Sequence, residues 1–154
     1  MAVDVHRNDL GRIAARGSVS VPALCAVESH AFVHHLVSTV RARVGEDIGT
    51  KEVLASVLPV GSVTGAPKRA AMMKIAALEV EKRGIYTGVY GAIGGDGSMT
   101  LAVAIRTIVA DSLGGASYGS GGGIVADSDS AREWDELAWK ERALSAPRRG
   151  ARSK

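Results

Sequence analysis

Glycine constrains the fold of this chain more than any other residue type, because 19 of its 154 residues are glycine. Gly94, Gly95 and Gly97 separate two apolar, strand-like runs over 85–93 and 99–110, and this is the pattern of a β-hairpin. Three more glycines, at 121–123, precede another short apolar run. Only 4% of the residues are aromatic. The core must therefore be built from Val, Ile, Leu, Ala and Met, with many tight turns.

Predicted helices and strands follow one another without a regular rhythm. We expect strands over 18–21, ending at Pro22, over 30–44, 85–93 and 99–110, and around 123–125. The apolar spacing of 30–44 also fits a helix, but its β-branched residues favour the strand. Helices are expected over 50–58 with Thr50 as N-cap, over 69–82 ended by Gly84, and from an N-cap within 127–130 through about 144. The order predicts an α+β fold with a largely antiparallel sheet.

Composition narrows the class of protein. The length fits one domain, over residues 1–145, and a hydrophobic content of 46% argues against general disorder. No apolar run is long enough for a membrane span, and the N-terminus has no secretory signal pattern, so we expect a cytoplasmic protein without a membrane partner. The single cysteine, Cys25, excludes an intramolecular disulfide and a multi-cysteine zinc site.

The basic isoelectric point of 9.2 has a local origin. Four of the 19 basic residues lie in the last nine positions, and the remainder are balanced by 16 acidic residues. Residues 146–154 are therefore predicted to be a solvated, disordered basic tail. Because no basic stripe is interleaved with aromatic residues, nucleic acid is not an expected partner.

A first candidate site is the 61–68 segment, Gly-Ser-Val-Thr-Gly-Ala-Pro-Lys, which leads into a predicted helix. Free backbone N–H groups and the helix dipole favour an anion there. The spacing of Gly61, Gly65 and Lys68 does not fit a P-loop. An ordinary loop with a helix cap is an equal alternative from these residues alone.

The predicted last helix carries a second candidate. Glu133, Glu136 and Lys140 are spaced i, i+3, i+7, so they share one helical face beside the apolar stripe. Two carboxylates at the edge of a core need a cation or strong donors, and Mg²⁺ suits such oxygen ligands. The alternative is a simple i,i+4 ion pair between Glu136 and Lys140 on a solvated face.

Further polar residues and glycines extend this picture. Arg106 is expected within the strand 99–110, where it needs an anionic partner, and Tyr86 starts the neighbouring strand and could reach the same space. The glycines at 121–123 lead into a strand, which is the wrong context for a dinucleotide fingerprint, but their backbone can approach a ligand closely. His30 and His34 are spaced i,i+4 without a known metal-ligand pattern. Together these features predict a pocket for a small polyanion.

The ordered set of motifs resembles the chorismate-utilising enzymes, which include anthranilate synthase component I, aminodeoxychorismate synthase component I, and the isochorismate and salicylate synthases. The 61–68 sequence resembles the aminodeoxychorismate synthase version, whereas anthranilate synthases more often have Gly-Thr-Leu-Ser-Gly-Ala-Pro-Lys. The resemblance covers nearly all of the chain up to about residue 144. The matching segments are Arg-Asn-Asp-Leu-Gly-Arg at 7–12, His-Leu-Val-Ser at 35–38, the 61–68 segment, Ala-Ile-Arg-Thr at 104–107, Gly-Gly-Gly-Ile-Val-Ala-Asp-Ser at 121–128, and Glu133-x-x-Glu136-x-x-x-Lys140.

By this resemblance, Glu136 would be a Mg²⁺ ligand with Glu133 beside it, and the metal would hold the ring carboxylate of chorismate. The backbone N–H groups of Gly121 and Gly123, with Lys140, would bind that same carboxylate. The remaining implied contacts are Arg106 and Tyr86 for the enolpyruvyl carboxylate, Gly65 and Ala66 for the substrate, and His35 and Ser62 as catalytic residues that line the ring and its departing hydroxyl.

The implied chemistry is replacement of the C4 hydroxyl of chorismate by ammonia, with the metal as Lewis acid. A separate glutamine amidotransferase subunit would supply the ammonia, and the product would serve para-aminobenzoate and folate synthesis. Anthranilate synthase component I, in tryptophan synthesis, is the alternative. A non-catalytic remnant or a partner-binding piece is a hypothesis of a different class.

The resemblance also implies that this chain matches only the C-terminal part of the family's catalytic domain, a little over half of it. The remaining part would carry another Mg²⁺-binding glutamate, a Gly-Thr substrate contact and the nucleophilic lysine of aminodeoxychorismate synthases. We therefore expect no chorismate turnover by the 154-residue chain alone.

Overall fold

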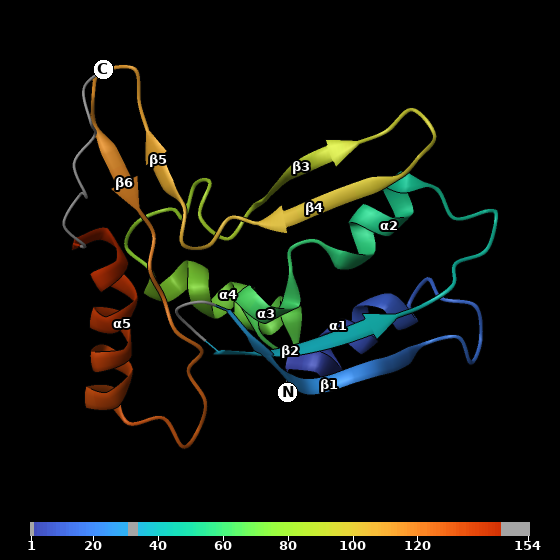
Figure 1. The fold of residues 1–154 in the computed structure, drawn as a ribbon, viewed down its shortest axis with the longest axis horizontal. Helices are drawn as coiled ribbons and strands as arrows, with labels where there is room; N and C mark the ends of the chain where they lie inside the picture. The colour runs from blue at the N-terminus through green and yellow to red at the C-terminus, as the bar shows by residue number, and fades with distance from the viewer. Residues whose placement is uncertain (1, 31–33, 146–154) are drawn as a thin grey trace. The chain divides into compact units, whose positions relative to one another are not determined.

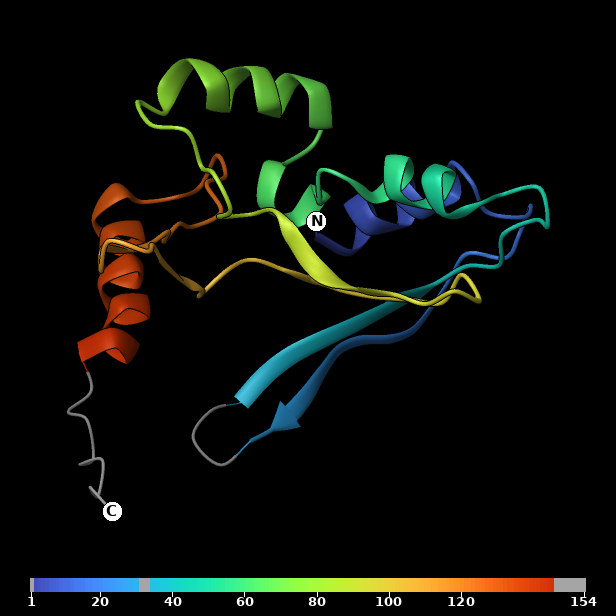
Figure 2. The ribbon, with the colours of Figure 1, turned by 90° about the horizontal axis from the view of Figure 1, so that it is seen from above.

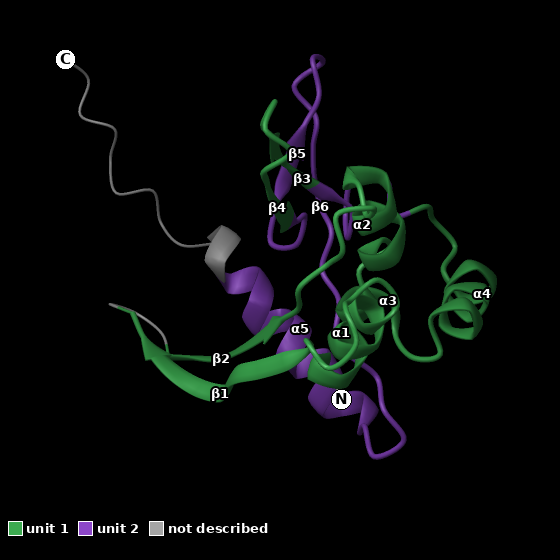
Figure 3. Cartoon of the chain, turned by 90° about the vertical axis from the view of Figure 1, so that its right-hand side faces the viewer, with its two compact units in different colours: residues 1–82, 90–102 green, residues 83–89, 103–154 purple. Residues whose placement is uncertain are grey.

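The computed structural model describes residues 2–30 and 34–145, and its helices and strands are labelled in Figure 1. The chain divides into two compact units, which Figure 3 distinguishes by colour. Unit 1 comprises residues 1–82 and 90–102, and unit 2 comprises residues 83–89 and 103–154. The predicted basic tail, residues 146–154, lies outside the described residues.

Unit 1 contains the helices α1 (Ala2–Gly11), α2 (Thr50–Val57), α3 (Gly61–Thr64) and α4 (Lys68–Leu78), and the 61–68 segment comprises α3 and the residues that lead into α4. Helix α1 contacts α2 and α3, and α3 contacts α4. The N-cap of α2 is Gly49 and not Thr50 as predicted. The reason is that the Gly49 N–H donates a hydrogen bond of 3.1 Å back to the Glu52 carboxylate, so the helix begins one residue earlier.

Helix α4 is shorter than its sequence predicts. It ends at Leu78, with Glu79 as C-cap, and not at the predicted Lys82 before Gly84. No residue of α4 is buried. Because tertiary packing supplies most of the stability of a helix in a protein, good helix formers alone do not extend this one.

Strands β1 (Ser20–Ser29) and β2 (His34–Arg41) form an antiparallel ribbon in unit 1, seen from above in Figure 2. The prediction of a strand within 30–44 is confirmed, but the first strand does not end at Pro22. Pro22 lies where the register shifts between Ser20 and Ala23, and a proline is tolerated at such a bulge because no ladder hydrogen bond is required of it. Strand β2 also contacts α1.

Strands β3 (Val89–Ile93) and β4 (Met99–Val103) form the predicted hairpin. Its turn is closed by the Gly94 N–H, which donates to the Ser98 carbonyl over 2.8 Å, and by Gly97, which donates to Gly94 over 3.0 Å. Both strands are shorter than the predicted runs 85–93 and 99–110. Tyr86 therefore lies in a turn before β3 and not at the start of a strand.

The strand conformation ends after β4, whereas the sequence predicts one continuous strand over 99–110. Ala104 exchanges backbone hydrogen bonds with Thr87 and Gly88, and Arg106 then bends the chain with a φ of 51°. A new strand, β5 (Ile108–Ala110), pairs antiparallel with β6 (Ala116–Tyr118). The Asp111 carboxylate accepts backbone hydrogen bonds within this second turn and fixes it. The strand predicted around 123–125 is wrong, because those residues form a loop.

Helix α5 (Ser130–Ser145) closes unit 2 and confirms the predicted last helix. Asp129 caps it, since its carboxylate accepts a hydrogen bond of 3.0 Å from the Arg132 N–H. Within the described part of the chain, Ala104 is the one buried hydrophobic residue, and many large apolar side chains are exposed. The three two-stranded sheets and the helices together make the predicted α+β fold. Within residues 2–30 and 34–145, no helix has the length and apolarity that a bilayer crossing requires.

Candidate functional site

The predicted site residues fall into two groups, one in each unit. Unit 1 contains His35, Ser62, Gly65 and Ala66. Unit 2 contains the predicted carboxylate-binding and metal-binding residues, which are Tyr86, Arg106, Gly121, Gly123, Glu133, Glu136 and Lys140.

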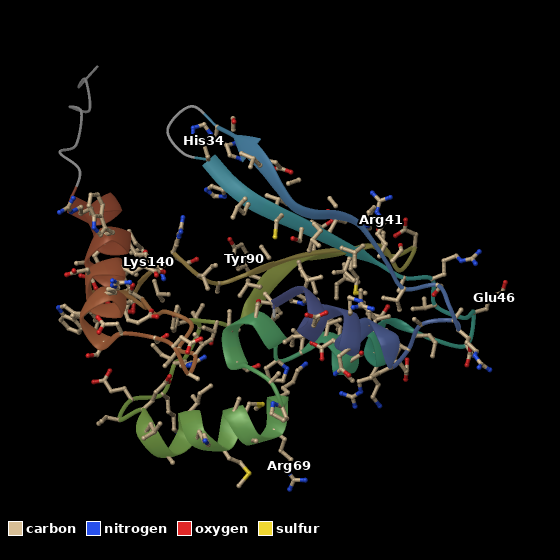
Figure 4. The ribbon with its side chains drawn as sticks, turned by 90° about the horizontal axis from the view of Figure 1, so that it is seen from below. His34, Arg41, Glu46, Arg69, Tyr90 and Lys140 are labelled. Carbon is tan, nitrogen blue, oxygen red and sulfur yellow. The ribbon has the colours of Figure 1, made fainter. Side chains whose placement is uncertain are left out.

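Lys140 is at the centre of the group in unit 2, and Figure 4 labels it on α5. Its Nζ lies 2.7 Å from Glu136 Oε1, one helical turn away, and donates a hydrogen bond of 2.8 Å to the Gly121 carbonyl. The lysine thus joins the glycine loop to a carboxylate of α5. The hydrogen bond that Lys140 donates to the Glu136 carboxylate, together with the lysine's positive charge, lowers the pKa of Glu136 from its ordinary value. Glu136 therefore remains a carboxylate at neutral pH, while its side chain is more than half exposed.

Glu133 lies one turn before Glu136 and is held by a different contact. Its Oε1 accepts a hydrogen bond of 2.6 Å from Ser128 Oγ. The same hydroxyl accepts a hydrogen bond from the Val125 N–H over 3.0 Å, so Ser128 connects the loop after the glycines to α5. Glu133 Oε2 lies against this loop as well, because a Cβ on Gly122 would come within 3.2 Å of it.

Tyr86 packs against the same glycine loop. A Cβ on Gly119 would overlap the tyrosine ring, and a Cβ on Gly121 would lie 2.5 Å from the phenol oxygen. Both positions must therefore be glycine for the ring to lie there. The Arg83 guanidinium lies 6.0 Å from the ring centroid, at the limit of a cation–π contact. The structure thus brings Tyr86 next to Gly121, two of the predicted site residues.

Arg106 does not occupy the environment that the sequence predicted. It lies on the bend between β4 and β5, and it is exposed. A guanidinium in water needs no fixed anionic partner, so the argument that a strand interior demands one does not apply here. Its side chain is free to meet an anion that arrives from solution.

In unit 1, Ser62 lies on α3, and Gly65 and Ala66 connect α3 to α4. Gly65 has a φ of 123°, a conformation that a residue with a side chain rarely adopts, and a Cβ there would come within 3.1 Å of Ala71. The Gly65 N–H donates to the Gly61 carbonyl over 2.9 Å and closes the short helix. The 61–68 segment is thus a compact turn with a specific backbone shape.

His35 lies on β2, where it is exposed and pairs across the ribbon with Glu28. Its ring makes an edge contact with His30, with centroids 5.3 Å apart. His34 hydrogen-bonds to Ser29 over 3.0 Å. Among the described residues, no group of three or more His, Cys, Asp or Glu side chains is arranged to hold a metal ion.

The donor set on α5 nevertheless suits Mg²⁺. Glu133 and Glu136 supply carboxylate oxygens one helical turn apart, and Mg²⁺ characteristically takes one or two protein carboxylates and completes its shell with water and substrate oxygens. A side chain at position 122 would crowd the Glu133 carboxylate, because its Cβ would lie 3.2 Å from Oε2.

Two positioning residues of unit 2 were not named as site residues from the sequence. Ser128 holds Glu133, and Gly119 accommodates Tyr86. A serine just before a helix cap and five residues before a predicted metal ligand could have indicated the first. Nothing in the sequence pairs Gly119 with Tyr86.

Comparison with known proteins shows the family of the chain. A family model described as chorismate binding enzyme matches residues 1–146. The chain is 48% identical over 151 residues to anthranilate synthase component 1 of Streptomyces coelicolor, and the matched region covers 97% of this chain. It is 43% identical over 148 residues to the protein of the same name in Synechocystis, which covers 94%. The chain spans 29% of the length of each of these two relatives.

Solved structures show the same fold. Anthranilate synthase component I from Streptococcus pneumoniae matches with a TM-score of 0.79 and 38% identity, over 94% of this chain and 33% of that one. A protein of Bacillus anthracis described as a 2,3-dihydroxybenzoate-specific isochorismate synthase matches with a TM-score of 0.74 over 94% of this chain and 39% of its own. At 22% identity, this second likeness concerns the fold alone. The two sequence relatives and the first of these structures are named anthranilate synthase component I, so the aminodeoxychorismate synthase subtype that the 61–68 sequence favours is not confirmed.

Proposed function

This chain belongs to the chorismate binding enzyme family, and we propose on that basis that it supplies part of the chorismate site of an anthranilate synthase component 1. The reaction would convert chorismate and ammonia to anthranilate, with release of pyruvate and water. The identity of 48% to the Streptomyces coelicolor enzyme supports this choice within the family.

The observation that carries the proposal is the cluster around Lys140. One ammonium group connects a glycine loop to a carboxylate of α5, and a second carboxylate, Glu133, lies one turn away. A substrate carboxylate can replace the Gly121 carbonyl as partner of Lys140, because the exchange substitutes a stronger, charged hydrogen bond for a neutral one. The backbone N–H groups of Gly121 and Gly123 would complete the recognition of that carboxylate.

The other predicted residues of unit 2 would bind the second carboxylate of chorismate. Arg106 is exposed and always charged, and it can form a bidentate contact with the enolpyruvyl carboxylate. The Tyr86 hydroxyl, which lies beside Gly121, would donate a hydrogen bond to the same group. These roles come from the family resemblance.

In unit 1, the proposed roles concern the ring. His35 and Ser62 would face the departing hydroxyl, and the backbone at Gly65 and Ala66 would contact the substrate. The fixed shape of the 61–68 segment supports a binding role, because a preformed backbone turn loses little entropy when a ligand binds to it.

Glu133 and Glu136 would hold Mg²⁺, which when bound supplies Lewis-acid stabilisation of the substrate oxygens. The 2.6 Å hydrogen bond from Ser128 would hold the Glu133 carboxylate in the orientation needed to bind the metal ion. Glu136 is more than half exposed, so a metal ion can reach its carboxylate. A glutamine amidotransferase subunit is the proposed source of ammonia.

A second candidate function is aminodeoxychorismate synthesis, with the amino group at C4. The Gly-Ser-Val-Thr-Gly-Ala-Pro-Lys sequence of residues 61–68 favours it, and so does Gly-Gly-Gly-Ile-Val-Ala-Asp-Ser-Asp at 121–129. The two functions share the site described above and differ in the position of the new C–N bond.

The proposal can be tested in a hybrid enzyme. Residues 1–146 of this chain, which the family model matches, would replace the corresponding segment of the Streptomyces coelicolor anthranilate synthase component 1. The hybrid would be given chorismate, Mg²⁺ and ammonium chloride. We expect ammonia-dependent anthranilate, detected by its fluorescence. Coupling to aminodeoxychorismate lyase would detect the 4-amino product and so favour the second candidate.

Matched variants on α5 make this test specific. Glu136→Gln should abolish formation of the product, whereas Glu141→Gln, the same change at another exposed position of the same helix, should leave it intact. A folded hybrid that forms neither product, or equal rates in the two variants, would contradict the proposed site.

A further inference from the structure

A buried cluster of charged and polar groups in unit 1 is not explained by the proposed substrate contacts. In the described part of the chain, Asp9 and Ser56 are the two buried polar side chains, and they belong to the same cluster. Ser56 Oγ donates a hydrogen bond to the Asp9 carbonyl and joins α2 to α1. The third member is Lys68, the first residue of α4.

The Asp9 carboxylate contacts both ends of the 61–68 segment. Its Oδ1 forms an ion pair of 2.9 Å with Lys68 Nζ at the C-terminal end of the segment. Its Oδ2 lies against Gly61 at the N-terminal end, since a Cβ on Gly61 would come within 3.1 Å of that oxygen. The Lys68 ammonium also donates a long hydrogen bond of 3.5 Å to the Ser56 carbonyl.

Stability alone does not account for this arrangement. Removing a carboxylate and an ammonium from water is costly, and apolar residues of similar size stabilise a buried site as well or better. The cost is higher here because Asp9 Oδ2 is buried and, within the described residues, has no hydrogen-bond partner. What the ion pair does supply is a fixed distance between α1 and the first residue of α4.

Gly61 shows how closely the segment is held. A Cβ at this position would overlap the Val5 side chain of α1, so α3 can lie this close to α1 only with glycine there. Ser62, Gly65 and Ala66 all lie between this contact and the Lys68 ion pair. A displacement of Asp9 would therefore alter the contacts at both ends of the 61–68 segment that contains them.

We propose that Asp9 is a positioning residue, which holds the 61–68 segment in its ligand-binding shape through the ion pair with Lys68 and the contact with Gly61. Its importance for substrate rests on the proposed function, in which Ser62, Gly65 and Ala66 contact chorismate. The clamp itself does not depend on that function, so the two can fail separately.

The test uses a neutral pair, Asp9→Asn with Lys68→Met in the same 154-residue chain. This double variant keeps the size of both side chains and leaves no buried charge unpaired. Amide hydrogen exchange would be followed by NMR at Gly65, which is hydrogen-bonded to Gly61, and at Val37 in β2 as a distant reference within unit 1. Asp4→Asn, which removes an exposed ion pair with Arg7 on the same helix, is the matched control.

We expect exchange at Gly65 to rise about tenfold or more in the neutral pair, because local opening of the segment becomes easier, with no change at Val37. Asp4→Asn should change neither. Unchanged exchange at Gly65 would overturn the proposal. An equal rise at both positions would overturn it as well, because it would show loss of stability throughout the unit and not of position in the segment.

A second readout links the clamp to substrate. Chorismate affinity, measured by calorimetry on the same proteins, should fall in the neutral pair and not in Asp4→Asn. If the unaltered chain binds no chorismate, the proposed function fails, and the exchange experiment still decides whether Asp9 positions the segment. If the neutral pair binds chorismate as well as the unaltered chain, Asp9 is not a positioning residue for substrate.

Discussion

Lys68 in unit 1 and Lys140 in unit 2 make the same two kinds of contact in very different surroundings. Each ammonium pairs with one carboxylate and one backbone carbonyl: Asp9 and Ser56 for Lys68, Glu136 and Gly121 for Lys140. The two lysine side chains are similarly covered, at 19% and 23% exposed. Their partners differ, since Asp9 is 3% exposed and Glu136 is 58% exposed.

This difference indicates what each lysine can do. A buried carboxylate cannot exchange its ammonium partner for water or ligand without leaving a charge unpaired, so the Asp9 pair is committed to holding structure. An exposed carboxylate loses little when its partner turns away, so Glu136 and Lys140 are available to a metal ion and a substrate carboxylate. The same set of contacts thus serves as a clamp in one unit and as a binding site in the other.

The largest expected effect is on stability. Lys68→Met leaves the Asp9 carboxylate buried without its partner and should lower the free energy of unfolding by about 3 kcal/mol or more. Lys140→Met leaves Glu136 in water and should lower the urea midpoint much less. Equal losses of stability in the two variants, followed by circular dichroism, would show that burial of the carboxylate does not distinguish the two pairs.

An effect of intermediate size, on metal affinity, is expected at Ser128, which positions the Glu133 carboxylate of α5. Removing its hydroxyl in Ser128→Ala should weaken Mg²⁺ binding about tenfold, because the Glu133 carboxylate loses the hydrogen bond that orients it. Both tryptophans of the chain, Trp134 and Trp139, lie on α5, so their fluorescence reports the titration. Ser130→Ala is the control, and equal Mg²⁺ affinity in both variants would remove Ser128 from the site.

The smallest expected effect concerns protonation. The hydrogen bond from Lys140 and its charge hold the pKa of Glu136 below the ordinary value, so Lys140→Met should raise that pKa toward it. Because the folded-state pKa is lowered, the pair stabilises the fold fully above the pKa of the unfolded chain and loses this contribution as pH falls through the folded pKa. A carbon-detected NMR titration of the Glu136 carboxyl measures the change. An unaltered pKa in the variant would mean that Lys140 is not the cause.

Much of the site in unit 2 could be predicted from the sequence because it is local. The cap at 127–130, the helix after it and the i,i+4 spacing of Glu136 and Lys140 all depend on neighbours in the chain, and the structure has each of them. The interpretation of that pair as a simple ion pair describes its geometry correctly. The predicted metal and substrate remain proposals that rest on the family.

The features that could not be predicted depend on residues far apart in the sequence. Arg106 was expected inside a strand, but the backbone of Ala104 pairs with Thr87 and Gly88 and the chain then bends. Helix α4 ends at Leu78, and none of its residues is buried, so good helix formers alone do not carry it to the predicted end. The ion pair between Asp9 and Lys68 joins the 7–12 and 61–68 segments, which are far apart in the sequence, and no spacing rule connects them.

The most direct test of the central proposal is an NMR titration of the 154-residue chain with chorismate in the presence of Mg²⁺. Binding at the Lys140 cluster predicts saturable shifts of the Gly121 and Gly123 amide signals, and loss of those shifts in Lys140→Met. If the glycine signals do not move, or move equally in Lys140→Met, the cluster does not bind the carboxylate and the proposed site is wrong.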